Sequence, residues 1–114
     1  MDERQAVVSA LAVDCHDPDT LATFWYELLG GELVVWPQYG VVALRAPGIT
    51  IDFTLVPEDQ AGKNRLHLDL ATSDPGATVA RALQLGATRG DAMHMSNDFT
   101  ALREILCEFA APDI

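Results

Sequence analysis

Two short segments of the sequence alternate polar residues that can do chemistry with large apolar residues. Residues 66–70 read LHLDL, and residues 50–55 read TIDFTL. Because successive side chains of a β-strand point to opposite faces, the first segment places His67 and Asp69 together, and the second places Asp52 on a polar face. A histidine can donate or accept a proton at neutral pH, and a carboxylate accepts hydrogen bonds. These residues are therefore the first candidates for acid–base chemistry or ligand binding.

An internal repeat indicates which elements position these residues. The pair Asp17-Pro18 recurs as Asp74-Pro75, 57 residues later in a chain of 114 residues. An aspartate side chain can accept hydrogen bonds from the N–H groups of a first helical turn, and proline is favoured at the first helical position. Each pair follows an apolar stretch and precedes a segment that ends in Leu-Gly. The repeat therefore predicts a strand followed by a helix in each half of the chain.

Further strands are predicted after the first helix. Residues 33–36, 40–46 and 49–56 are rich in β-branched and aromatic side chains, and prolines and glycines separate them. The second half is expected to follow the same order, which gives two pseudo-repeats over about residues 6–56 and 64–111. A chain as short as one half buries only about 60% of its unfolded surface. The halves are therefore expected to share one core.

The segment over residues 99–110 supports two interpretations. The repeat predicts strands there, because the first half has strands at the corresponding positions. Leu102, Ile105 and Phe109 instead recur at the spacing of a helix. The repeat favours the strands.

Composition limits the class of protein. The chain has 49% hydrophobic residues and a formal net charge of −10, so it can fill a core as a single domain over residues 1–114 and would repel nucleic acids and anionic lipids. Two cysteines are too few for a small fold that is held together by several disulfide bonds. The stretch 33–44 has no charged residue, but it is shorter than the roughly 20 residues of a membrane helix. We expect a cytoplasmic protein with no nucleic-acid or membrane partner.

The polar faces of the predicted strands are expected to converge. If each half forms a curved sheet backed by its helix, Asp14 and Asp52 of the first half and His67 and Asp69 of the second line one concave groove between the halves. A concave surface with a few convergent polar groups is typical of a small-molecule site. An organic ligand is therefore the expected partner.

Four stretches of the chain resemble the vicinal oxygen chelate superfamily, in its glyoxalase-like, bleomycin-resistance and dioxygenase group. They read VDCHDPDTLATFWYELLGGE, ITIDFTLVPED, GKNRLHLDLATSDP and ALQLGATRGD. The resemblance implies an α+β fold of two βαβββ modules, which form a curved mixed sheet with the helices on its outer face. It also implies a homodimer. In metal-dependent members of the superfamily, four His or Glu side chains hold a divalent ion, one from the first and last strand of each module.

Only some of these four metal-ligand positions correspond to a residue of this chain that can bind a metal ion. His67 matches the first-strand position of the second module, and its counterpart in the first module is Ala10, which cannot bind a metal ion. The last-strand position of the first module falls at or beside Asp52. The last position of the second module falls near Ala110, with Glu108 two residues earlier on the same face. The resemblance therefore implies at best a three-ligand set of His67, Asp52 and Glu108.

The sequence favours a glyoxalase-like small-molecule-binding protein that needs no cofactor. Its predicted ligand-binding residues are the polar and aromatic side chains near the groove: His67, Asp69, Asp52, Trp36, Tyr39 and Asp14. Trp36 and Tyr39 are included because they flank a turn and can stack on an aromatic ligand. The alternative is a metal-dependent lyase, isomerase or dioxygenase with one divalent metal ion. A third interpretation is a dimeric accessory subunit whose groove holds a protein partner.

Overall fold

The computed structural model describes residues 5–57, 68, 70–87 and 101–102 of the chain. Its elements follow the order strand, helix, then three strands in the first half. In chain order they are β1 (Leu11–Cys15), α1 (Pro18–Leu29), β2 (Glu32–Trp36), the 3-10 helix η1 (Pro37–Tyr39), β3 (Val41–Ala46), β4 (Ile49–Leu55), β5 (Leu70–Ala71), α2 (Pro75–Gln84) and β6 (Ala101–Leu102). None of the helices described is long and apolar enough to span a membrane.

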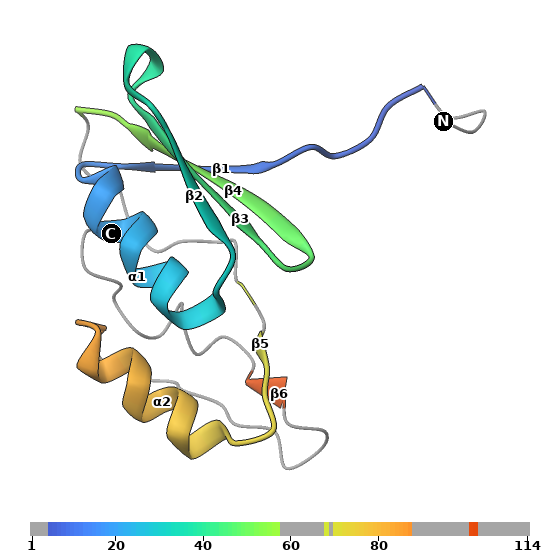
Figure 1. The fold of residues 1–114 in the computed structure, drawn as a ribbon, viewed down its shortest axis with the longest axis vertical. Helices are drawn as coiled ribbons and strands as arrows, with labels where there is room; N and C mark the ends of the chain where they lie inside the picture. Colours follow the sequence, from blue (N-terminus) through green and yellow to red (C-terminus); the bar gives the residue numbers. More distant parts are fainter. Residues whose placement is uncertain (1–4, 58–67, 69, 88–100, 103–114) are drawn as a thin grey trace.

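The first half forms an open, mixed sheet of four strands in the order β1-β4-β3-β2 (Figure 1). β1 runs parallel to β4, and the other two pairs are antiparallel. The connection from β1 to its parallel neighbour contains α1, which covers one face of the sheet. The α+β class predicted from the sequence is confirmed, and the bounds of β2, β3 and β4 differ by one residue at most from those expected.

β1 begins later than the apolar stretch over residues 6–13 suggests. Its first paired residue is Leu11, which lies opposite Ile51 of β4. If this parallel register continued backward, Ser9 would lie opposite Ile49, where β4 begins. The residues before Ser9 therefore extend beyond the end of their neighbour, and strand-forming side chains alone do not make a strand without one.

Both predicted helix starts are confirmed. The Asp17 carboxylate accepts a hydrogen bond from the backbone N–H of Thr20 at 3.2 Å and another from the Thr20 hydroxyl at 2.6 Å. Asp74 accepts the corresponding bond from the backbone N–H of Ala77 at 3.0 Å. The backbone angles of the two aspartates are nearly the same, with φ of −134° and −139°. The Asp-Pro pairs therefore begin the two helices in the same way.

The hydrogen bond from the Thr20 side chain holds the pKa of Asp17 below its ordinary value of 3.8. A carboxyl group with a lowered pKa in the folded state stabilises the fold above its unfolded-state pKa, and this stabilisation is lost as the pH falls through the folded-state value. We therefore expect Asp17→Ala to lower the melting temperature at neutral pH and Asp17→Ser, which keeps a capping oxygen, to lower it less. The difference between wild type and Asp17→Ala should shrink as the pH falls below 3.8 in thermal melts. If the difference in melting temperature between wild type and Asp17→Ala stays constant below this pH, the Asp17 carboxylate does not stabilise the helix in this way.

Within the described part of the chain, one cluster of buried side chains contains residues of both halves. From the first half it contains buried side chains of α1 and of the sheet, among them Leu21, Trp25 and Phe53. From the second half it contains Val79 and Ala82 of α2. The partly buried residues packed against it include Leu28 and Leu29 of α1 and Leu68 and Leu70 of the segment that carries β5. The apolar side of α1 therefore faces the core.

The second half is described only in part. β5 pairs with β6 in antiparallel orientation, with Leu70 opposite Leu102, whereas β1 pairs with β4 in parallel. Two residues of the predicted strand region 99–110 are thus in a strand. Its other residues, and those of the remaining predicted strands of this half, lie outside the described part of the chain.

Candidate functional site

The face of the sheet opposite α1 carries the polar side chains that the sequence singles out. Along β4, Ile51 and Phe53 are buried on the α1 side, so the residues that alternate with them, Thr50, Asp52 and Thr54, occupy the other face. We call this other face of the four strands the open face. Its residues are ordered in rows across the sheet by the strand register.

The first row of the open face combines a carboxylate with an aromatic ring. Asp14 of β1 lies opposite Thr54 of β4, Thr54 opposite Val41 of β3, and Val41 opposite Trp36 of β2. Asp14 is exposed, and the Trp36 side chain retains 42% of its accessible surface. The row therefore has a charged end and an aromatic end.

The second row places one carboxylate among small side chains. Ala12 of β1 lies opposite Asp52, Asp52 opposite Ala43 of β3, and Ala43 opposite Val34 of β2. Ala43 is buried, with 5% of its surface exposed, yet it does not belong to the hydrophobic core on the α1 side. Asp52 therefore lies between two short side chains, that of Ala12, which is exposed, and that of Ala43, which is buried.

The third row carries the basic side chain of the open face. Arg45 of β3 lies opposite Thr50 of β4 and opposite Glu32 of β2. Arg45 is therefore in a different row from both Asp14 and Asp52. Within the described part of the chain, neither of these two carboxylates has a hydrogen bond or an ion pair with a side chain.

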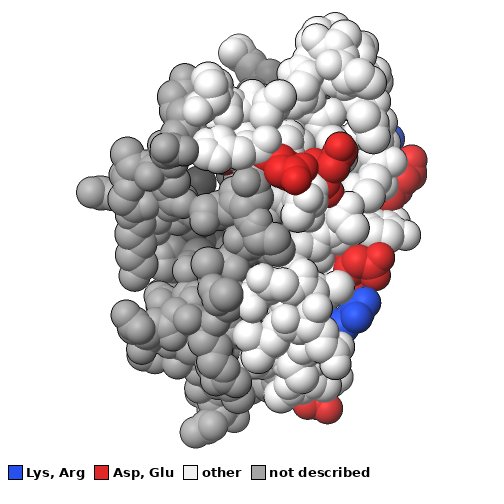
Figure 2. Space-filling model, turned by 90° about the vertical axis from the view of Figure 1, so that its left-hand side faces the viewer, with Lys and Arg blue, Asp and Glu red and all other residues white. Residues whose placement is uncertain are grey.

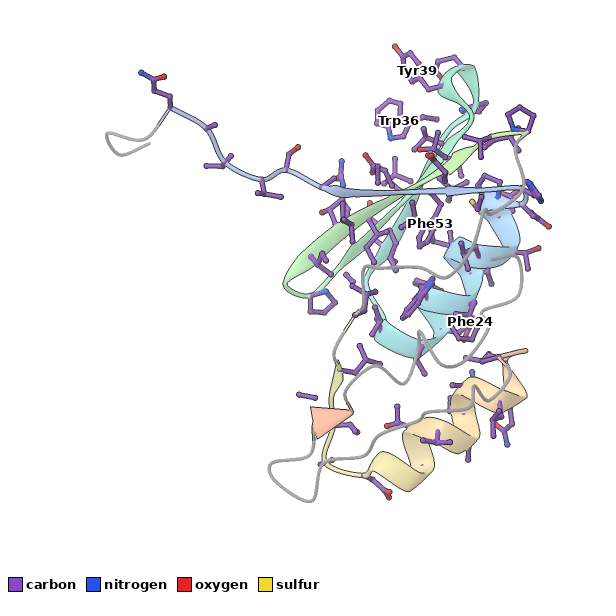
Figure 3. All side chains as sticks on the ribbon, turned by 180° about the vertical axis from the view of Figure 1, so that it is seen from behind. Phe24, Trp36, Tyr39 and Phe53 are labelled. Atoms are coloured by element: carbon purple, nitrogen blue, oxygen red, sulfur yellow. The ribbon has the colours of Figure 1, made fainter. Side chains whose placement is uncertain are left out.

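Tyr39 lies beyond the strand rows. It ends the helix η1 at the tip of the hairpin between β2 and β3, where 70% of its surface is exposed. Figure 3 shows Trp36 and Tyr39 at this end of the hairpin and Phe53 on the side of α1. The structure thus brings Asp14, Asp52 and Trp36 to one face, with Tyr39 at its rim.

Three predicted site residues cannot be placed on this face. His67, Asp69 and Glu108 lie outside the described residues. The predicted groove between the two halves requires His67 and Asp69 on its second side, so it cannot be placed either. Those predictions therefore stay predictions.

The described residues do not fit the four-ligand metal site of the metal-dependent members. Ala10 precedes β1, Ala12 lies opposite Asp52, and neither alanine can donate a lone pair to a metal ion. Among the residues that the structure describes, no three His, Cys, Asp or Glu side chains are grouped closely enough to hold a metal ion. The metal-dependent alternative therefore needs His67 and Glu108 in addition to Asp52.

A hollow lies on the opposite side of the sheet from the open face. Its volume is about 410 Å³, and side chains of α1 line it together with Leu85 and Gly86 after α2. The α1 side chains are Asp19, Thr20, Thr23, Phe24 and Glu27. Arg81 of α2 donates a hydrogen bond to Glu27 at 3.3 Å. This wide opening between two helices does not include any of the predicted site residues.

Acidic side chains outnumber basic ones on the described surface seen in Figure 2, in line with the net charge of −10. The field around the protein is therefore negative, which attracts cations and repels phosphate-rich partners.

Val41 and Ala43 of β3 were not among the residues expected on the open face. The alternation in VVALRA over β3 contains the signal, since the buried Val42 and Leu44 lie between Val41, Ala43 and Arg45. Ala43 was not singled out because an alanine carries no chemistry of its own. Its position beside Asp52 follows from the pairing of β3 with β4.

The comparison with protein families agrees with this architecture. The family model described as Glyoxalase-like domain matches residues 10–104, which is most of the chain. The chain belongs to the glyoxalase-like domain family. This family is part of the vicinal oxygen chelate superfamily, so the resemblance stated from the sequence is confirmed. No curated protein and no solved structure matches the chain significantly.

Proposed function

We propose that this glyoxalase-like protein binds a small organic molecule on the open face of its sheet and needs no metal ion to do so. The observation that carries the proposal is the row in which Asp52, half-buried and without a side-chain partner among the described residues, lies between Ala12 and Ala43. A carboxylate next to the short, exposed side chain of Ala12 offers a directed hydrogen-bond acceptor that a ligand can reach from the β1 side.

The same face favours a flat ligand with a positive charge. The exposed ring of Trp36 can stack on an aromatic ligand or lie against a cation, which is worth about 0.5–2 kcal/mol. Asp14 and Asp52 supply negative charge, and Arg45 lies in the third row beside Glu32. Amines, amidines and related aromatic cations are therefore the ligand class that we propose.

Within the superfamily, this function belongs with ligand-binding proteins such as the bleomycin-resistance group and not with the dioxygenases. Small, uncharged side chains at Ala10 and Ala12 support metal independence. His67 and Asp69 are proposed to face the same ligand from the second half. The acidic composition and the two cysteines support a cytoplasmic location.

A screen of aromatic cations by tryptophan fluorescence tests the proposal. A compound bound to the open face should change the emission of the exposed Trp36 and not that of Trp25, which is 5% exposed in the core. For a compound found in this way, we expect Asp52→Asn to weaken binding about tenfold or more, because a charge-assisted hydrogen bond contributes about 1.5–3 kcal/mol.

Asp19→Asn is the matched control. It removes the same charge from a carboxylate on the α1 side, in the wall of the hollow, and should leave the dissociation constant nearly unchanged. Trp36→Phe should remove the fluorescence response. If Asp52→Asn binds as tightly as wild type, or if Asp19→Asn weakens binding to the same degree, the ligand does not lie on the open face.

A further inference from the structure

Asp14 and Asp52 occupy diagonal positions on the open face. Asp14 of β1 lies opposite Thr54 of β4, and Asp52 precedes Thr54 by two residues on the same strand. Neighbouring strands lie about 4.8 Å apart and each strand residue rises by about 3.3 Å, so the Cα atoms of the two aspartates are about 8 Å apart. The two carboxylates are therefore separate groups that one small molecule can reach together.

The side chains around these two carboxylates are short and carry no positive charge. Ala12 lies opposite Asp52, and Thr54 lies opposite Asp14. We call these four residues the β1 corner of the open face. Ala12 and Asp14 are exposed, whereas Asp52 and Thr54 are half-buried. The Thr54 hydroxyl adds a hydrogen-bond donor and acceptor on the same face, between the two aspartates.

The basic side chain of the open face does not neutralise the β1 corner. Arg45 lies opposite Glu32, and it is diagonal to Asp52 and two rows away from Asp14. Within the described part of the chain, no ion pair joins Arg45 to either aspartate. A ligand with a single positive charge on Asp52 would therefore leave the charge of Asp14 without a partner.

We propose that Asp14 makes the ligand site selective for dications, that is, for organic molecules with two positive groups on one rigid skeleton. This inference rests on the proposed function, in which Asp52 binds the first positive group, and it assigns the second positive group to Asp14. Each group forms a charge-assisted hydrogen bond with its own carboxylate. A rigid skeleton holds the second group in place, so little further conformational freedom is lost. Aromatic diamines and diamidines belong to this class.

Two compounds that differ by one amino group test the proposal. At neutral pH, 1,4-bis(aminomethyl)benzene has an ammonium group at each end of its ring, and 4-methylbenzylamine has one ammonium group in all. In calorimetric titrations, we expect wild type to bind the diamine about tenfold more tightly than the monoamine. A factor of about two is statistical, because either amino group can bind Asp52, and about fivefold is due to the exposed Asp14 carboxylate. Asp14→Asn should lower the ratio of the two dissociation constants to about two.

Asp19→Asn is the control for the negative field of the whole protein. It removes the same charge on the α1 side of the sheet, and it should leave the ratio at about ten. The inference is overturned if the ratio is the same in wild type and Asp14→Asn, or if Asp19→Asn lowers it as much as Asp14→Asn does. In both cases, binding of the monoamine that is weakened by Asp52→Asn would leave the proposed function intact. A wild-type protein that binds neither compound would contradict the proposed function and this inference together.

Discussion

Replacing Gly31 with alanine is expected to lower the free energy of unfolding by about 3 kcal/mol or more, a large part of the roughly 5–15 kcal/mol that stabilises a typical domain. Gly31 has a φ of +105°, a region that side-chain-bearing residues rarely adopt. A Cβ atom at this position would collide with the backbone oxygen of Arg45 and would lie 2.8 Å from the Cα atom of Ala46. Both obstacles are backbone atoms of β3, so they cannot move without disturbing the pairing of β2 with β3.

Gly30 is the matched control for this substitution. It also has a positive φ, of +78°, but a Cβ atom there would have no other atom within 4 Å. Gly30→Ala should therefore cost only the conformational strain of its φ of 78° and ψ of −168°, about 1–3 kcal/mol, without the added collision. Urea denaturation of the two variants checks the difference. Equal losses of stability would mean that β2 does not approach β3 as closely as the structure shows.

Replacing Phe53 with alanine is expected to lower the free energy of unfolding by about 3–5 kcal/mol. Phe53 is 1% exposed and belongs to the core between the sheet and α1 (Figure 3). Its neighbours Asp52 and Thr54 lie on the open face, where Asp52→Ala and Thr54→Ala should each change stability by less than about 1 kcal/mol.

This alternation tests the assignment of the open face. A shift of β4 by one residue would exchange its two faces and move Asp52 into the core. Chemical denaturation of the three variants would then show a large loss for Asp52→Ala or Thr54→Ala. A large loss for Phe53→Ala alone supports the face on which the proposed ligand site depends.

Much of the first half can be predicted from the sequence because the interactions that determine it join residues that are close together in the chain. Capping by Asp17 involves atoms within one helical turn, and the alternation of apolar and polar residues around Asp52 depends on the geometry of a single strand. The face that Asp52 occupies could therefore be predicted without knowing its neighbours.

Neighbours across the sheet are set by contacts between distant parts of the chain. No property of Ala43 indicates that it lies beside Asp52, because this follows from the register of β3 with β4. The start of β1 likewise depends on where β4 begins, and the apolar residues Val7 and Val8 do not reveal it. The alternation of residues along one strand predicts which face of the sheet a side chain occupies. Its neighbours across the sheet follow only from the register between the strands.

The most direct test of the central claim is to titrate the aromatic cation found by the fluorescence screen in buffer with and without an excess of EDTA, following the emission of Trp36. Because we propose that the open face holds its ligand with Asp52 and Trp36, we predict the same dissociation constant in both buffers. Binding that disappears in EDTA, returns on addition of a divalent metal ion and is lost in His67→Ala would contradict the claim and establish the metal-dependent alternative.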